Sequence, residues 1–186
     1  MTIEELIKET EDRMKKSLEA TRHEFTLIRT GRANPSILEN VIANFYGQEM
    51  PVNQLANITV PEPRQLLITP WDKNALGAIE KGIMKSDLNL TPTNDGTSIR
   101  LTIPALNEER RKEFIKQLHK KAETGHAAIR NIRHDCINHL KAMTKAKECS
   151  EDDEKRASEK VQKLTDQYIA EINKATQIKE RELLEV

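Results

Sequence analysis

Apolar and small side chains recur every three or four residues along residues 107–147, a stretch that contains no proline. This spacing keeps one stripe on a single side of an α-helix. At about 1.5 Å per residue, the helix would be on the order of 60 Å long, so its stripe needs partner helices of similar length. The stripe consists of Phe114, Leu118, Ala122, Gly125, Ile129, Ile132, Cys136, Leu140 and Met143.

Two further segments supply such partners. Residues 2–29 repeat apolar positions at Ile3, Leu6 or Ile7, Thr10, Met14, Leu18, Thr21, Phe25 and Ile28. Residues from Ser150 onward repeat them at Ala157, Val161, Leu164, Tyr168, Ile172, Ala175 and Ile178. Asn107 is the predicted N-cap of the long helix, and Ser150 with Asp153 resembles a capping box. Short connections between long helices favour antiparallel neighbours.

Between residues 31 and 104 the hydrophobic period changes from helical to two, which is typical of strands. We expect strands at 41–46, 55–60, 66–69 and 99–103, a turn at Gly47, another turn at 94–96, and a short helix over 74–86. Several prolines keep these strands short. We expect Trp71 and Phe45 to lie in the core of this section.

The predicted fold is therefore α+β: a long antiparallel three-helix bundle with an inserted small α/β domain. The bundle comprises residues 1–30 and 105–186, and the inserted domain comprises residues 31–104. Because Gly31 and Pro35 interrupt one connection and Pro104 interrupts the other, we expect the two domains to change their relative orientation. The candidate hinge residues are Thr30, Gly31, Pro35, Pro104 and Ala105. If the apolar stripes of the three helices pack against one another, no apolar stripe remains exposed for a partner. We therefore expect an elongated monomer.

Net charge says little about partners, because 30 basic residues balance 30 acidic ones. The distribution is more informative, since residues 107–147 carry 11 basic and 5 acidic side chains. Nucleic acid is one possible reason, and a solvated helix face is the other. Without a long apolar run, a signal peptide pattern or a disulfide framework, we expect a cytoplasmic protein with no membrane span.

Sequence motifs of catalysis are missing, including the phosphate-binding loops and the nucleophile elbow. His119 and Glu123 are one turn apart but have no evident third metal ligand. Cys136 lies between His134 and His139, which point in other directions on a helix. We therefore expect no enzyme activity, no catalytic residue, no metal and no cofactor.

The most distinctive local feature is the segment 128–135, Ala-Ile-Arg-Asn-Ile-Arg-His-Asp. Arg130 and Arg133 lie side by side next to the apolar stripe, with His126 and His134 one turn away. Guanidinium groups suit phosphate oxygens. The alternative is that these arginines form ion pairs with Asp135, Asp12 or other carboxylates of the bundle.

Four more arginines lie near the predicted domain connections: Arg29, Arg32, Arg110 and Arg111. They are further candidates for contacts with RNA. The alternative is that they sit in a favourable helix end or a solvated first turn. Because no aromatic residues are interleaved with them, base stacking on single strands is not expected.

The chain resembles the bacterial ribosome recycling factors over nearly its whole length. The resemblance is carried by the residues of segments 28–39, 46–74, 79–91, 94–114, 128–136, 150–153 and 161–169. It departs from the usual family pattern at His134, where arginine is common, at Cys136 and Ile137, and at Asn89, where glycine is common.

The resemblance implies an L-shaped protein of tRNA-like dimensions that binds the post-termination ribosome. It implies contacts between the bundle and large-subunit ribosomal RNA, largely through Arg130 and Arg133. It also implies that elongation factor G, driven by its own GTP hydrolysis, acts with the protein to separate the subunits. A different RNA-binding module on the ribosome and a helical protein scaffold are the alternatives. The scaffold would need a leftover exposed apolar stripe.

Overall fold

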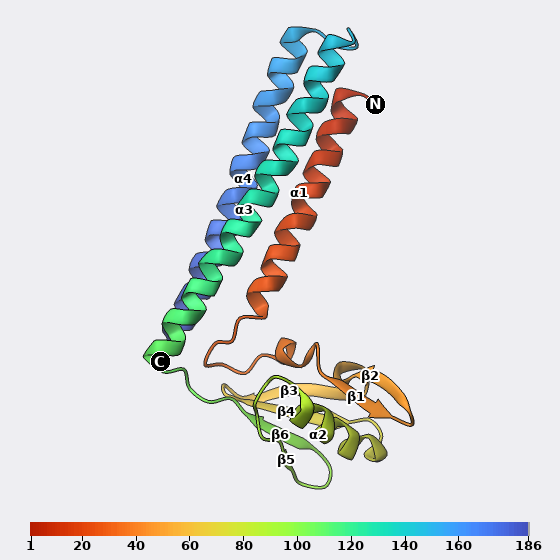
Figure 1. Ribbon diagram of the computed structural model, residues 1–186, viewed down its shortest axis with the longest axis vertical. Coiled ribbons are helices and arrows are strands. Elements are labelled where there is room, and N and C mark those ends of the chain that lie inside the picture. The colour runs from red at the N-terminus through yellow and green to blue at the C-terminus, as the bar shows by residue number, and fades with distance from the viewer. Residues whose placement is uncertain (186) are drawn as a thin grey trace. The chain divides into compact units, whose positions relative to one another are not determined.

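The computed structural model describes residues 1–185, and three long helices form its first compact unit (Figure 1). Helix α1 spans Ile3–Thr26, α3 spans Glu108–Lys145 and α4 spans Glu151–Leu184. Helix α3 runs antiparallel to both α1 and α4 (Figure 1). The predicted antiparallel three-helix bundle is confirmed.

Each long helix begins at a side-chain cap. Thr2 caps α1 with its hydroxyl. The Asn107 Oδ1 atom accepts a hydrogen bond from the Arg110 N–H at 2.7 Å, and the Ser150 Oγ atom accepts one from the Asp153 N–H at 3.1 Å. These bonds satisfy first-turn N–H groups that have no partner within their own helix. The caps predicted at Asn107 and Ser150 are confirmed.

The predicted stripes of α1 and α3 form the core of the bundle. Every stripe position of α3 from Leu118 to Met143 is buried, and Phe114 is half-buried. The core also accepts four threonines, whose hydroxyls each donate to the carbonyl four residues earlier at 2.7–3.0 Å: Thr10, Thr21, Thr165 and Thr176. These local bonds remove the cost of burying a hydroxyl without a partner.

The prediction for the last turns of α4 is wrong at Ile178, because this residue is 51% exposed. The buried face instead continues from Ile172 through Thr176 and Lys179 to Leu183. Hydrophobicity along the sequence favours Ile178 over Thr176, because isoleucine is the more apolar of the two side chains. The helix can bury Thr176 because its hydroxyl donates to the Ile172 carbonyl at 2.7 Å.

All three helices approach each other closely at Gly125 of α3. A Cβ atom added there would lie 2.7 Å from the Thr21 Oγ1 atom of α1 and 3.3 Å from the Ile172 Cδ1 atom of α4. Glycine in a helix interior costs about 1 kcal/mol relative to alanine. The close approach explains why this helix carries one.

The second compact unit contains two antiparallel sheets. The larger sheet has the strand order β3-β4-β6-β5, with β3 at Ala56–Glu62, β4 at Gln65–Pro70, β5 at Thr93–Asn94 and β6 at Ile99–Thr102. The smaller is a hairpin of β1 (Ile42–Phe45) and β2 (Gln48–Pro51), joined by Tyr46 and Gly47, which both have positive φ. Helix α2 (Leu76–Lys85) packs so closely on β1 that a Cβ at Gly82 would lie 2.5 Å from the Ile42 carbonyl oxygen. Strands β2 and β5 were not predicted.

The core of the second unit is almost entirely aliphatic, with Leu66, Ile68, Ile79, Ile99 and Leu101 fully buried. Phe45 is half-buried and packs against this core. The prediction for Trp71 is wrong, because this residue is 69% exposed. Trp71 follows the end of β4, where its N–H donates to the Leu55 carbonyl at 3.2 Å while its ring points outward from the core.

By spatial contact the chain divides into Met1–Ile28 with Glu113–Arg181, and Arg29–Lys112 with Glu182–Val186. The first turn of α3 therefore groups with the second unit, whereas the boundaries predicted from the sequence lie at residues 30 and 105. The connections at residues 28–34 and 103–107 contain neither helix nor strand. That the two units move against each other stays a prediction.

Asn89 has a φ of 54°, in the left-handed region where glycine is favoured. Asparagine tolerates this conformation better than most residues with a side chain. We expect Asn89→Ala to lower the free energy of unfolding by about 0.5–1 kcal/mol, and Asn89→Gly to leave it equal or higher. Urea unfolding of both variants checks this, and an alanine variant as stable as the glycine variant would contradict it.

Candidate functional site

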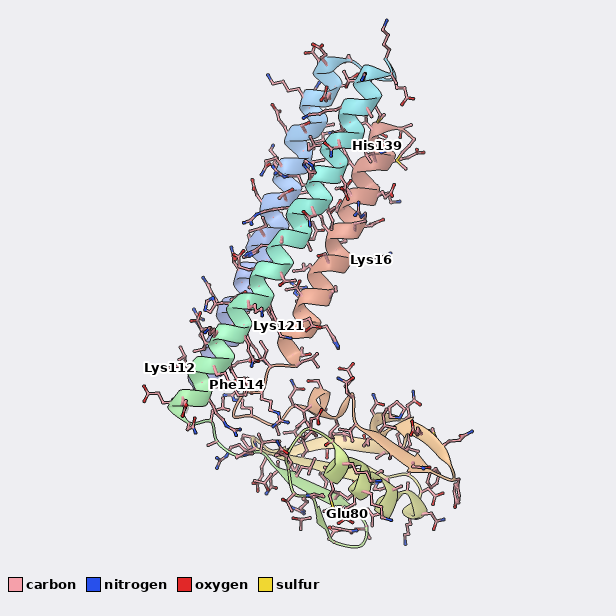
Figure 2. All side chains as sticks on the ribbon, viewed as in Figure 1. Lys16, Glu80, Lys112, Phe114, Lys121 and His139 are labelled. Atoms are coloured by element: carbon pink, nitrogen blue, oxygen red, sulfur yellow. The ribbon has the colours of Figure 1, made fainter. Side chains whose placement is uncertain are left out.

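The central turns of α3 present Arg130 and Arg133 beside the buried positions Ile129 and Ile132. Arg130 is exposed and Arg133 is half-buried. Both lie on the side of α3 that borders α4, because Arg133 contacts α4 directly. The opposite side of α3 borders α1 and carries Lys121 (Figure 2). The Lys121 Nζ group donates to the Glu24 Oε2 atom of α1 at 2.6 Å.

The Arg133 side chain is held by the side-chain amide of Gln162. Its Nη1 group donates to the Gln162 Oε1 atom of α4 at 2.8 Å, and the Gln162 Nε2 group donates to the Asp166 Oδ1 atom at 2.9 Å. The Arg133 Nε atom is buried without a hydrogen-bond partner. The aliphatic stem and Nε are therefore packed, while the end of the guanidinium lies at the surface between two helices.

The carboxylates that could neutralise these arginines are engaged elsewhere or distant. Asp135 pairs with Arg13 of α1 at 3.1 Å, on the other side of α3. Within residues 1–185, neither Arg130 nor Arg133 lies within ion-pair distance of a carboxylate. The alternative that Asp135 or Asp12 pairs with these arginines is wrong for this structure. Among the described residues, neither guanidinium group is therefore neutralised by an ion pair.

The two histidines beside the arginines have different surroundings. His126 is mostly buried, and its ring nitrogens lie 3.3 Å from the Glu123 Oε1 atom and 2.8 Å from the Asn173 Oδ1 atom. It therefore tethers α3 to α4 and does not extend the exposed charge. His134 is exposed. Cys136 is buried on a different side of α3, near Thr10 of α1, and burial raises the pKa of its thiol, which disfavours the nucleophilic thiolate.

The metal-ligand pair considered from the sequence is not formed. His119 lies 3.7 Å from Glu180 of α4, and Glu123 turns to His126. Throughout the described chain, no group of three or more histidine, cysteine, aspartate or glutamate side chains could hold a metal ion.

The second set of predicted site residues lies in the second unit, and only part of it forms a cationic cluster. Arg29 and Arg110 approach each other: burial and then the charge of Arg110 lower the pKa of Arg29. Arg32 is paired with Glu185 at 2.5 Å. Arg111 donates from Nη2 to the Leu106 carbonyl at 3.3 Å, and its Nε is buried without a partner. Arg29 and Arg110 are thus the stronger candidates for binding an anion.

The candidate hinge residues occupy the two irregular connections. Thr30 is buried, and its hydroxyl accepts a hydrogen bond from the Arg32 N–H at 3.2 Å. Pro35 begins a short 3₁₀ helix (Pro35–Leu38), while Pro104 and Ala105 are exposed. A Cβ at Gly31 would meet its nearest neighbour at 3.9 Å, so close packing does not demand glycine there.

Gln162, Asp166 and Asn173 are absent from the sequence-based candidates. Gln162 accepts a hydrogen bond from Arg133, Asp166 accepts one from Gln162, and Asn173 lies within hydrogen-bond distance of His126. Their spacing of four and seven residues places them in one row on α4, immediately beside its apolar stripe. A polar row flanking a buried stripe is the signal that could have indicated them.

The arrangement defines a long helical bundle with an uncompensated arginine pair on one face. A family model described as ribosome recycling factor matches residues 21–184. The ribosome-recycling factor of Carboxydothermus hydrogenoformans is 52% identical over 184 residues, which cover 99% of this chain and 100% of that protein. The Bacillus subtilis ribosome-recycling factor is 48% identical over 182 residues, or 98% of each chain. The chain belongs to the ribosome recycling factor family.

Solved structures agree with this assignment. The solution structure of a ribosome recycling factor matches with a TM-score of 0.78 and 42% identity, covering 100% of this chain and 99% of that one. A second match has a TM-score of 0.69 and 45% identity and covers both chains completely. It belongs to models of the T. thermophilus ribosome recycling factor and E. coli elongation factor G bound to the E. coli post-termination complex.

Proposed function

We propose that this protein binds the post-termination ribosome and, together with elongation factor G, separates it into subunits for a new round of translation. Family membership supports the proposal, as does the similar T. thermophilus protein placed with elongation factor G on a post-termination complex. In this proposal the GTP is hydrolysed by elongation factor G, and the recycling factor contributes binding surfaces and no catalytic group, cofactor or metal.

The observation that carries the RNA-binding part is the uncompensated charge of Arg130 and Arg133. An arginine already paired with a carboxylate gains little from a phosphate, because the pair must first separate. An exposed, unpaired guanidinium can hold phosphate oxygens or a guanine edge through two parallel hydrogen bonds. We propose large-subunit ribosomal RNA as the ligand of this pair, with Arg29 and Arg110 as a second contact and Arg32 and Arg111 as weaker ones.

The irregular connections support a hinge at Thr30, Gly31, Pro35, Pro104 and Ala105. A hinge would let the second unit change its orientation while the bundle stays bound.

Burial of the three stripes against one another supports a monomer. Among the described residues of the three long helices and the segment before α1, the large exposed apolar residues are Met1, Ile178 and Leu184, which form no stripe for a protein scaffold. No helix among residues 1–185 is long and apolar enough to span a membrane. The ribosomal role implies the cytoplasm.

The test is breakdown of purified polysomes by this protein, elongation factor G and GTP. We expect conversion of polysomes to monosomes and free subunits only when all three are present. The Arg130→Ala/Arg133→Ala double variant should be strongly impaired, while Arg13→Ala, which removes one charge from α1, should remain active. A wild-type protein that binds ribosomes without separating them would instead favour a different RNA-binding role on the ribosome.

A further inference from the structure

Gln162 and Asp166 lie one turn apart on the exposed side of α4 and form a hydrogen-bonded chain that ends at Arg133. We infer that these two side chains are positioning residues that hold the Arg133 guanidinium ready for an RNA ligand without neutralising its charge. This inference rests on the proposed RNA-binding role of Arg133.

Asp166 determines which end of the Gln162 amide faces Arg133. A glutamine amide has an acceptor oxygen and a donor nitrogen of nearly equal size, so it could turn either way. The Asp166 carboxylate only accepts hydrogen bonds, and it binds the Nε2 group at 2.9 Å. The Oε1 atom is thereby directed at the Arg133 Nη1 group, 2.8 Å away. A reversed amide would place two donors against each other.

The neutral amide matters because of the charge it leaves in place. A carboxylate at position 162 would also hold the guanidinium, but it would form an ion pair and repel a phosphate. With glutamine, one of the five N–H donors of Arg133 is used, and the group keeps its positive charge. The buried Nε atom has no partner and faces no solvent, so the ligand must be met by the Nη groups.

Ordering a long side chain before binding reduces the entropy lost on binding. We therefore expect Gln162→Ala and Asp166→Ala each to weaken the affinity for isolated large ribosomal subunits by roughly threefold to tenfold. Asp166→Asn should bind nearly as well as the wild type, because the asparagine oxygen can still accept from Gln162. Alanine favours helices, and both side chains are exposed, so the melting temperatures should stay close to that of the wild type.

A double-mutant cycle distinguishes positioning from other roles. In an Arg133→Ala background, Gln162→Ala should cause no further loss of affinity. An equal loss in both backgrounds would show that Gln162 acts independently of Arg133 and would overturn the inference. Normal affinity of Gln162→Ala beside a weakened Arg133→Ala would also overturn it, while leaving the proposed function intact. Normal affinity of Arg133→Ala would remove both the proposed contact and its positioning.

The Gln162→Glu variant tests whether the side chain at position 162 must be neutral. This variant should bind large subunits more weakly than Gln162→Ala, although it retains an oxygen for Arg133. Gln167→Glu makes the same charge change at an exposed position on another side of α4 and should have a smaller effect. Equal losses in the two glutamate variants would show that only the net charge of α4 matters and would contradict a specific role for the neutral amide.

Discussion

Ile132→Asp should unfold the helical bundle instead of merely weakening its binding. Ile132 is only 8% exposed and lies on the continuous buried face of α3. A carboxylate there would lose its hydration on a face of apolar side chains, which we expect to cost at least about 3 kcal/mol. For a chain of this size, that corresponds to a melting temperature lower by roughly 6–12 °C.

Circular dichroism at the helical band measures this melting. Asn131→Asp is the matched control, because it introduces the same carboxylate one residue away at an exposed position of the same helix. The free energy of unfolding of the control should lie within about 0.5 kcal/mol of the wild-type value. An Ile132→Asp variant that melts like the control would show that the buried face of α3 is misplaced.

Arg133→Ala should weaken binding to the large ribosomal subunit by about tenfold to a hundredfold, with a smaller loss for Arg130→Ala. A hydrogen bond from a charged group typically contributes about 1.5–3 kcal/mol. The fold should persist, because Arg133 contacts the exposed Gln162 and no carboxylate, and its buried Nε atom already lacks a partner. Affinity and melting temperature measured on the same variants separate binding from folding.

Arg13→Ala is the control for total charge. It also removes one arginine from the bundle, but that arginine is paired with Asp135 on the α1 side. An exposed ion pair contributes at most about 1 kcal/mol to stability. If Arg13→Ala and Arg133→Ala reduce the affinity equally, the effect is one of net charge and the arginine pair has no special role.

The sequence predicts the bundle well because burial in a long helix repeats. Eight consecutive stripe positions of α3 from Leu118 to Met143 are all buried, so the periodic signal is strong. The same reasoning fails at Ile178 and Trp71. Hydrophobicity alone does not reveal that a threonine hydroxyl can be satisfied inside a helix, or that the aliphatic core of the second unit is complete without a tryptophan.

The candidate site was predictable only in part. Arg130 and Arg133 are visible from their spacing on one helix, but sequence spacing could not decide between a phosphate and an intrabundle carboxylate. That choice depends on Asp135 facing Arg13, and on Gln162 facing Arg133 across two helices. Contacts between residues that are 29 or more positions apart depend on helix rotation and register, which periodicity does not fix.

The most direct test of the central claim is the salt dependence of the affinity for large ribosomal subunits. Each phosphate contact releases condensed counterions, so losing one should reduce the slope of log affinity against log salt by about one. We predict a shallower slope for Arg133→Ala than for the wild type, and an unchanged slope for Arg13→Ala. Identical slopes for all three proteins, together with wild-type affinity of Arg133→Ala, would contradict the claim that this arginine binds ribosomal RNA.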